Sequence, residues 1–310
     1  MLTLTHELIG RFQRIVYDRS GLHFSGHKLV FFERQLRERL DKGRLDDFES
    51  YYRRLTEDPS ELDLLVQGLT TNRTYFYRNP GHFKALRDTV FPEIIEAKNK
   101  EVVSSWGRQG ESYNFDGPHP AMRLRVWSSG CSTGEETYSI AFSLLEALSY
   151  PRAWDVEVLG TDIKRDALAS ARAGVYDEAS VKELPPEIAG KYMESTVGGY
   201  AVRENVSRVV KFREANLKEF TGPPPGALTL RDLDGTVETL DTRGYFDVVF
   251  CRNVMIYFDR EGQQRLVDAL YECLAPGGYL FTGDSEPLHL FSHGFVQAGG
   301  DESLYYRKPL

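Results

Sequence analysis

One stretch, from Val126 to Leu148 (VWSSGCSTGEETYSIAFSLLEAL), restricts the fold of this 310-residue chain more than any other. A short β-prone run enters a turn of small residues, and a helical pattern with apolar side chains at three- and four-residue steps follows. A strand, a glycine turn and a helix form the first unit of a nucleotide-binding α/β sheet. Gly130 and Gly134 let the backbone approach a ligand closely. Because their G-x-x-x-G spacing differs from the dinucleotide fingerprint G-x-G-x-x-G, the turn alone indicates an adenosine-type cofactor and nothing narrower.

The rest of the chain predicts an α/β fold with a mostly parallel sheet and an antiparallel edge, because strand-like and helical segments alternate before a closing hairpin. The strand-like segments are 124–127, 156–162, 246–250 and 279–283, and residues 295–296 and 304–306 indicate the closing pair. Residues 198–212 are consistent with another hairpin. Residues 101–121 are predicted to be a surface insertion or linker, and residues 221–244 a loop or small excursion.

Residues 1 to about 70 have a helical pattern, with Leu29, Phe32, Leu36 and Leu40 on one stripe. The predicted division is a helical N-terminal domain at 1–75, a connector helix and linker at 76–122, and the sheet domain at 123–310. Arg34 and Arg37 flank the stripe, where they form either a solvated face or a docking face for an acidic partner.

Composition excludes several classes of protein. A net charge of -8 argues against a globally basic nucleic-acid binder. No apolar run approaches the ~20 residues that span a bilayer, so we expect no membrane insertion. The first residues lack a secretory signal, and three cysteines in no metal spacing fit reduced thiols, so a cytoplasmic location is expected. Monomer is the default oligomeric state.

Polar residues that follow the predicted strands should meet at the carboxyl edge of the sheet, where such folds bind ligands. Asp162 suits a ribose diol, or it caps the next helix. Asn216 could bond an adenine edge, or it is a turn residue. The full set is Ser128 to Glu136, Asp162, Asn216, Arg252 and Asn253.

Glu135 and Glu136 begin the helix after the glycine turn, and each completes a capping-box pattern with Ser132 or Thr133. One glutamate can cap the helix while the other faces the ligand, and we favour Glu135 for the second role. A carboxylate there suits an ammonium or sulfonium group rather than a pyrophosphate. This points to S-adenosylmethionine (SAM) rather than a dinucleotide.

Several separated blocks resemble the chemotaxis-receptor glutamate methyltransferases, the CheR family. The blocks are LTTNRTYFYR at 69–78, RVWSSGCSTGEETYS at 125–139, GTD at 160–162, FDVVFCRNVMIYFD at 246–259 and LAPGGYLFTGDSE at 274–286. The resemblance implies a small all-helical N-terminal domain on a SAM-dependent methyltransferase (Rossmann-like) sheet. It also implies an inserted antiparallel β-subdomain, expected at about 195–213.

The resemblance also implies the activity: methyl transfer from SAM to glutamate side chains of methyl-accepting chemoreceptors, giving glutamyl methyl esters and S-adenosylhomocysteine (SAH). Tyr257 would stand near the transferred methyl, and Arg78 would orient a carboxylate or be held structurally by an acid. The implied cofactor contacts are Asn72, Thr74, Arg78, Glu135, Asp162, Asn216, Leu217, Arg252 and Asn253.

The implied chemistry agrees with the side chains present. A glutamate of pKa ~4.3 is already an anion at neutral pH, so attack on a sulfonium methyl needs no general base. No catalytic triad or HExxH motif is needed or found. His289 and His293, four residues apart, favour surface or packing roles over a metal site. The alternative function is a SAM- or SAH-binding regulatory or scaffold protein without transfer activity. A nucleic-acid methylase would carry N-P-P-Y or D-P-P-Y at 252–255.

Overall fold

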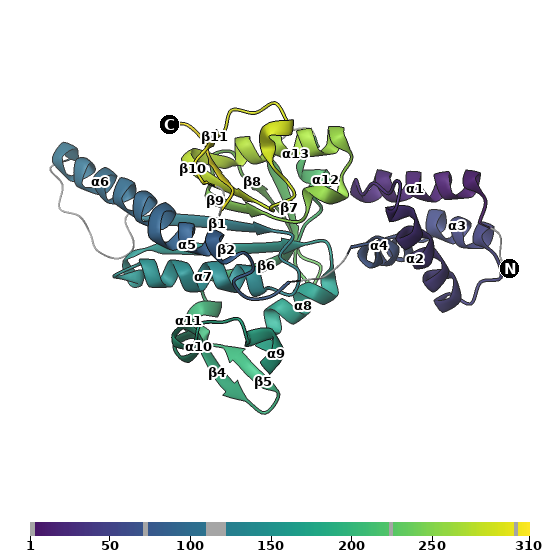
Figure 1. Ribbon diagram of the computed structural model, residues 1–310, viewed down its shortest axis with the longest axis horizontal. Helices are drawn as coiled ribbons and strands as arrows, with labels where there is room; N and C mark the ends of the chain where they lie inside the picture. Colours follow the sequence, from purple (N-terminus) through teal and green to yellow (C-terminus); the bar gives the residue numbers. More distant parts are fainter. Residues whose placement is uncertain (1–3, 71–73, 110–121, 223–225, 301–302) are drawn as a thin grey trace.

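The computed structural model describes residues 4–70, 74–109, 122–222, 226–300 and 303–310. Within these residues lie a helical domain, a nine-stranded sheet with helices on both faces, and a three-stranded sheet below it (Figure 1). The predicted α/β fold with a helical N-terminal domain and a small antiparallel sheet is confirmed.

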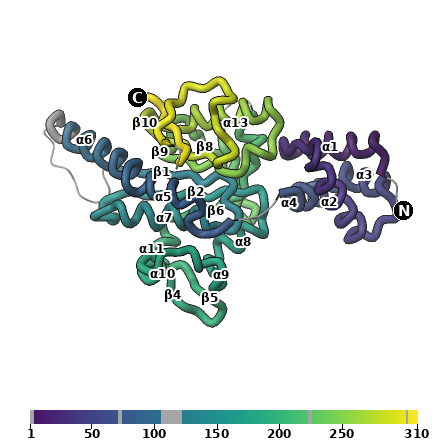
Figure 2. The backbone as a smooth tube through the Cα atoms, in the orientation of Figure 1, coloured from purple at the N-terminus to yellow at the C-terminus, as the bar shows by residue number. Residues whose placement is uncertain are grey.

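The helical domain is built, over residues 4–70, from α1 (His6–Ser20), α2 (Lys28–Lys42), α3 (Phe48–Glu57) and α4 (Pro59–Gly68). Phe32, Leu36 and Leu40 of the predicted stripe are buried in its core, and Leu29 is half-buried. Asp47 caps α3 by accepting a hydrogen bond from the backbone N–H of Ser50 at 2.7 Å. Figure 2 shows this domain as a separate lobe at one end of the molecule.

A second run of helix follows the connector: α5 (Pro80–Ala85), a π-helical turn (Leu86–Val90) and α6 (Phe91–Gln109). The predicted linker at 101–121 is therefore wrong over its first nine residues, which extend α6 beyond the sheet (Figure 1). Residues 110–121 lie outside the described residues.

The large sheet has the strand order β11-β12-β10-β9-β1-β2-β6-β7-β8 over the described residues. Its central strands are parallel, as predicted, and are buried on both faces because helices cover both sides. The parallel strands are β1 (Arg123–Ser129), β2 (Asp155–Asp162), β6 (Val210–Glu214), β9 (Phe246–Cys251) and β10 (Leu274–Thr282). The predicted antiparallel edge is formed by β12 (Tyr305–Arg307) and β11 (Val296–Gln297).

The other edge corrects the expectation for residues 221–244. This segment supplies β7 (Ala227–Arg231) and β8 (Val237–Asp241), an antiparallel hairpin that continues the sheet beyond β6. Asp232 to Thr236 make its turn, with Gly235 at a φ of +93°. The hairpin satisfies backbone groups that a loop would leave to solvent.

The small sheet is also placed differently from the prediction. It joins β3 (Val175–Tyr176), β5 (Gly199–Val202) and β4 (Met193–Thr196), all antiparallel. Residues 206–212 were predicted as the second strand of a hairpin with 200–203. Instead, α11 ends at Ser207, and residues 210–214 pair with β2 of the large sheet as β6. The insertion therefore runs from about residue 175 to 202 rather than 195 to 213.

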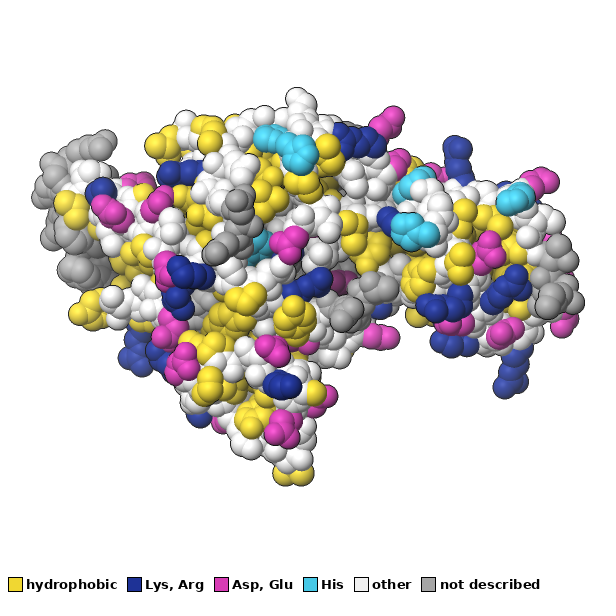
Figure 3. All heavy atoms as spheres, in the orientation of Figure 1, with side chains coloured by type: hydrophobic (Ala, Val, Ile, Leu, Met, Phe, Trp, Pro, Cys, Tyr) yellow, Lys and Arg dark blue, Asp and Glu magenta, His cyan; other side chains and the backbone are white. Residues whose placement is uncertain are grey.

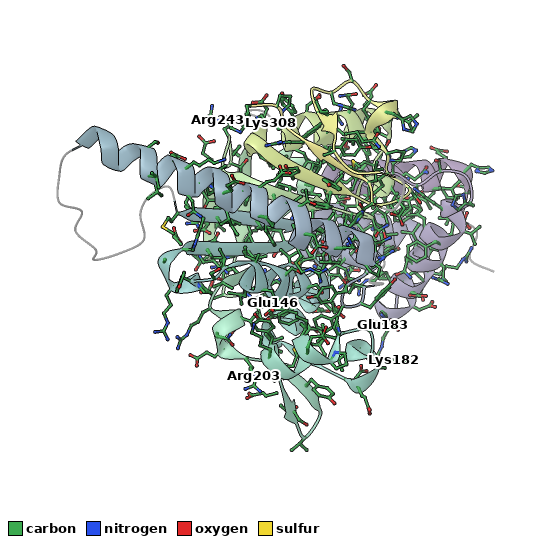
Figure 4. The ribbon with its side chains drawn as sticks, turned by 60° about the vertical axis from the view of Figure 1, so that its left-hand side comes forward. Glu146, Lys182, Glu183, Arg203, Arg243 and Lys308 are labelled. Atoms are coloured by element: carbon green, nitrogen blue, oxygen red, sulfur yellow. The ribbon has the colours of Figure 1, made fainter. Side chains whose placement is uncertain are left out.

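Helices fill the two faces of the large sheet. One face carries α7 (Glu135–Ala147) and α8 (Arg165–Ala173), with α5 and α6 beside them; the other carries α12 (Leu217–Phe220) and α13 (Arg260–Cys273). Three short helices surround the small sheet: α9 (Glu178–Val181), α10 (Pro186–Tyr192) and α11 (Glu204–Ser207). Figure 4 shows Glu146 of α7 facing this subdomain, and it accepts a hydrogen bond from the Tyr192 hydroxyl at 2.5 Å.

Candidate functional site

The glycine turn after β1 is held against the end of β2. The backbone N–H groups of Gly130 and Cys131 donate to the carbonyl of Thr161 at 2.7 and 2.9 Å. Gly130 has a φ of +79°, and a Cβ added there would lie 2.3 Å from a methyl of Val254. The turn needs glycine for its backbone conformation and for the close approach of the segment after β9.

Four strand ends and the end of α1 enclose one pocket at the carboxyl edge of the sheet. From the sheet side it is lined by residues that follow β1, β2, β6 and β9, as the fold predicts. Its lining residues are Ser20, Leu22, Thr70, Gly130, Ser132, Thr161, Asp162, Ile163, Ala215, Asn216, Leu217, Asn253, Val254, Tyr257 and Phe258.

Five of the ten site residues expected from the sequence lie in this lining: Asp162, Asn216, Leu217, Asn253 and Tyr257. The side chain of Asp162 accepts hydrogen bonds from the N–H groups of Ser132 at 2.8 Å and Lys164 at 2.9 Å. It therefore ties the glycine turn to the end of β2 and does not cap α8, whose first residue is Arg165. Burial raises the pKa of Asp162.

Asn216 is a cap and a link between domains. Its side-chain oxygen accepts from the N–H of Lys218 at 3.0 Å, which caps α12, and its Nδ2 donates to the carbonyl of Arg19 at 2.8 Å. The bond to Lys218 agrees with the prediction that Asn216 is a turn residue, since Asn commonly caps a helix. The bond to Arg19 of α1 was not predicted.

Among the remaining expected residues, Arg252 stands beside the pocket lining rather than in it. It is 4% exposed, and its guanidinium pairs with Glu136 at 3.2 Å and donates to the carbonyl of Arg78 at 2.8 Å. It also donates to the Asn79 side chain. Arg252 thus holds the backbone that carries Arg78. Thr74 is half-buried outside the lining, and Asn72 lies outside the described residues.

The two glutamates of α7 face different surroundings. Glu136 accepts from the Ser128 hydroxyl at 2.8 Å and pairs with Arg252, and burial raises its pKa against the pull of that cation. Glu135 accepts from the Thr133 hydroxyl at 2.7 Å, and burial raises its pKa too. Neither glutamate forms a capping box, because Gly134 is the N-cap and makes no side-chain bond. Glu136 is the glutamate joined to Arg252, and which of the two faces the cofactor stays a prediction.

Ser20 and Leu22 are lining residues that sequence reasoning missed. They come from the end of α1 and the residues after it, where no local motif marks a site. Glu136 was named in the sequence pattern, but its link to Ser128 and Arg252 depends on how β1, α7 and β9 pack.

Two buried polar atoms of the site have no hydrogen-bond partner within the described part of the chain: the hydroxyl of Ser132 and Nε of Arg252. Buried polar groups are rarely left unpaired, so these atoms fit a site built to receive a polar ligand. With the pocket carboxylate of Asp162 and the buried Glu136, they match the donors and acceptors of an adenosine-type cofactor with a cationic end.

Other candidate sites are not supported. Over the described residues, no cluster of three or more His, Cys, Asp or Glu side chains could hold a metal ion. No helix in the same residues is long and apolar enough to cross a membrane. All three cysteines are buried as free thiols.

Two family models match this chain. "CheR methyltransferase, all-alpha domain" matches residues 7–70, and "CheR methyltransferase, SAM binding domain" matches residues 115–303. The second covers the large sheet apart from β12, with the strand ends that line the pocket, so SAM is the cofactor that the fold binds.

Curated relatives agree over nearly the full length. "Chemotaxis protein methyltransferase 2" of Vibrio cholerae is 30% identical over 302 residues, which cover 96% of this chain and 92% of the relative. "Chemotaxis protein methyltransferase" of Escherichia coli is 32% identical, covering 94% and 87%. "Probable biofilm formation methyltransferase WspC" of Pseudomonas aeruginosa is 30% identical, covering 96% of this chain and 61% of its own length. On the family match and these identities, the chain belongs to the CheR methyltransferase family.

Proposed function

We propose that this chain transfers the methyl group of SAM to glutamate side chains of methyl-accepting chemoreceptors, giving glutamyl methyl esters and SAH. One observation carries the proposal: Asp162 at the end of β2 and Asn253 and Tyr257 in the segment after β9 line a single pocket. The relatives named chemotaxis protein methyltransferases support the substrate class.

The proposed cofactor contacts follow from the geometry of the pocket. The Asp162 carboxylate accepts from the ribose hydroxyls, and Glu136, in place of Glu135, faces the cationic end of the cofactor. Arg252 acts mainly by holding Glu136 and the backbone of Arg78. The other proposed contacts are Asn72, Thr74, Asn216, Leu217 and Asn253.

Bound SAM supplies an electrophilic methyl group on a sulfonium. A carboxylate oxygen of the substrate glutamate forms the new O–CH3 bond while the S–CH3 bond breaks and its electron pair stays on sulfur. The enzyme must therefore remove water from an anion and align it, not deprotonate it. Tyr257 is proposed to donate a hydrogen bond to this carboxylate, and Arg78 to orient it through its planar guanidinium.

Removing either group should slow methyl transfer while the fold is retained. We expect Arg78→Ala and Tyr257→Phe to lower kcat by roughly ten- to a hundredfold, because a hydrogen bond to a charged group is worth roughly 1.5–3 kcal/mol. Circular dichroism at wild-type intensity serves as the control for folding. Wild-type turnover in both variants would remove these roles.

The helical domain is the proposed docking face for the acidic receptor helices. Arg34 and Arg37 are exposed on α2. Arg34 lies 3.7 Å from Glu38, and the Arg37 guanidinium sits over the Phe48 ring. Basic and acidic side chains are interspersed on the visible surface of this domain (Figure 3). Reversing the charge of both arginines should raise KM for receptor and leave SAH affinity unchanged.

The deciding experiment is transfer of labelled methyl from SAM to receptor cytoplasmic fragments. The expected product is a base-labile ester that is lost when the receptor's glutamates are changed to Asp or Ala. Tight SAH binding without transfer to any receptor fragment would instead identify a regulatory or scaffold protein.

A further inference from the structure

Glu286 is a buried carboxylate outside the pocket lining. It follows β10 and is 4% exposed. Its Oε2 accepts hydrogen bonds from the backbone N–H groups of Asn253 at 2.6 Å and Gly283 at 3.0 Å, and its Oε1 accepts from Ile256 at 3.1 Å. These are charge-assisted bonds, and a buried carboxylate costs free energy unless such donors satisfy it.

The segment that Glu286 holds, residues 253–257, carries two lining residues of the pocket, Asn253 and Tyr257. Asn253 has a φ of +60°, a conformation that side chains rarely adopt without support. Both backbone polar groups of Ile256 have a side-chain partner. Its N–H donates to Glu286, and its carbonyl accepts from the Lys28 ammonium of α2 at 2.6 Å.

We propose that Glu286 is the positioning residue of methyl transfer: it fixes the 253–257 segment so that the Tyr257 hydroxyl and Asn253 face the reacting groups. The inference rests on the proposed function. Glu286 does not line the pocket, so it acts through the backbone of the segment. Burial raises the pKa of Glu286, and its backbone donors oppose that rise.

The first variant is Glu286→Gln, which keeps the shape but presents an amide N–H to one of the three backbone donors. We expect kcat for methyl transfer to fall at least about tenfold. The second variant is Gly283→Ala, because a Cβ there would lie 2.5 Å from Glu286 Oε2. The same Cβ would lie 3.1 Å from N and Nδ2 of Asn253, so this variant disturbs the contact between the carboxylate and the segment without changing Glu286. It tests the inference even if Glu286→Gln does not fold.

Two controls separate positioning from stability. Glu61→Gln changes another buried glutamate, 4% exposed and paired with Arg39 at 2.6 Å in the helical domain. It should lower Tm without lowering kcat of the folded protein. Gly190→Ala adds a Cβ within α10 with no heavy atom within 4 Å, so it should leave kcat unchanged and raise Tm slightly, because alanine favours a helix over glycine.

A double-mutant cycle with Tyr257→Phe gives the decisive readout. If Glu286 acts through the tyrosine, the tenfold loss from Glu286→Gln or Gly283→Ala should shrink to less than about threefold when the hydroxyl is already absent. Equal losses in both backgrounds, or kcat unchanged in both variants, would overturn the inference. A wild-type chain that binds SAH but transfers no methyl would contradict the proposed function instead. In that case SAH affinity tests the inference about Glu286. Glu286→Gln and Gly283→Ala should both weaken SAH binding, because Asn253 lines the pocket, and unchanged affinity would overturn the inference.

Discussion

Four residues around the pocket hold backbone conformations that side chains usually avoid. Tyr77, Asn79, Ser132 and Asn253 have φ values of 55°, 62°, 51° and 60°. Apart from Arg44, they are the only residues other than glycine at positive φ in the described chain. Each such conformation costs on the order of 1–3 kcal/mol and persists only where neighbours enforce it. The neighbours here are Arg252 for Asn79, Asp162 for Ser132 and Glu286 for Asn253.

The two glutamates of α7 should differ when each is neutralised. Glu136→Gln removes the partner of Arg252 and leaves a buried cation unpaired, so SAH affinity should fall by about tenfold or more. Glu135→Gln changes only the bond to Thr133 and should have the smaller effect. Isothermal titration with SAH compares the two variants. A larger loss of SAH affinity in Glu135→Gln would favour Glu135 as the residue that faces the cofactor.

His82 should make the fold sensitive to acid. Burial, reinforced by Arg252, lowers the pKa of His82 from 6.5 to about 4. Below pH 6.5, His82 is therefore protonated in the unfolded chain but stays neutral in the folded chain. The free energy of unfolding then falls as pH falls toward 4. At pH 5 the loss from this group is about 2 kcal/mol, at 1.36 kcal/mol for each unit.

Urea unfolding at pH 7.5 and pH 5 measures this loss. His82→Phe, which keeps a ring against Phe281, should reduce the difference between the two pH values by about 2 kcal/mol. His6→Phe on the exposed start of α1 is the matched control and should leave the difference unchanged. The same pH dependence in His82→Phe and wild type would contradict the assignment.

At the scale of elements, the turn between β1 and α7 depends on Gly130. Gly130→Ala should destabilise the fold by about 1–3 kcal/mol and weaken SAH binding, because the new methyl strains a left-handed backbone and meets Val254. Gly10→Ala, in the middle of α1 with open space around it, should instead stabilise by up to about 1 kcal/mol. Thermal unfolding and SAH titration of both variants check the pair.

Elements that a local sequence pattern marks were predictable. The strand, turn and helix from Val126 to Leu148 follow from local pattern, as do the buried strands β2 and β9. The β7–β8 hairpin was missed because three prolines precede it and β8 is largely exposed, which weakens the strand pattern. Residues 206–212 are β-prone in sequence, but nothing local indicates that the strand starts at Val210 or that it pairs with β2 rather than β5.

The site likewise contains residues that could be predicted from the sequence and residues that could not. Asp162 and Asn253 were predictable because both follow buried strands, and strand ends meet at one edge of a parallel sheet. The wall formed by Ser20 and Leu22 was not, since it exists only where the helical domain docks. Which glutamate of α7 faces Arg252 depends on the packing of side chains and could not be read from spacing.

At the scale of the whole molecule, the helical domain is bonded to the segment that follows β9 at the pocket. Lys28 donates to the Ile256 carbonyl, the N–H of His23 donates to the Tyr257 carbonyl at 2.7 Å, and the Tyr17 hydroxyl donates to Asp259 at 3.0 Å. The domain proposed to dock a receptor is thereby joined to the segment that carries Tyr257.

Cutting one of these bonds should therefore affect turnover. Lys28→Met keeps the length of the side chain but cannot donate to Ile256, and we expect kcat to fall about tenfold or more, because a hydrogen bond from a charged group is worth roughly 1.5–3 kcal/mol. Lys42→Met removes an exposed charge at the other end of α2 and should retain wild-type kcat. Equal turnover in the two variants would show that the domains act independently.

The bond between Lys28 and Ile256 joins residues 228 positions apart, and this separation has a consequence for biosynthesis. A ribosome adding about 5–20 residues each second needs roughly 10–50 s to extend the chain from one to the other. During that interval the helical domain, whose contacts are local, can fold while its pocket wall faces solvent. The lining of the pocket is complete only after β9 has been synthesised and has paired with β1. Cofactor binding is therefore expected late in translation.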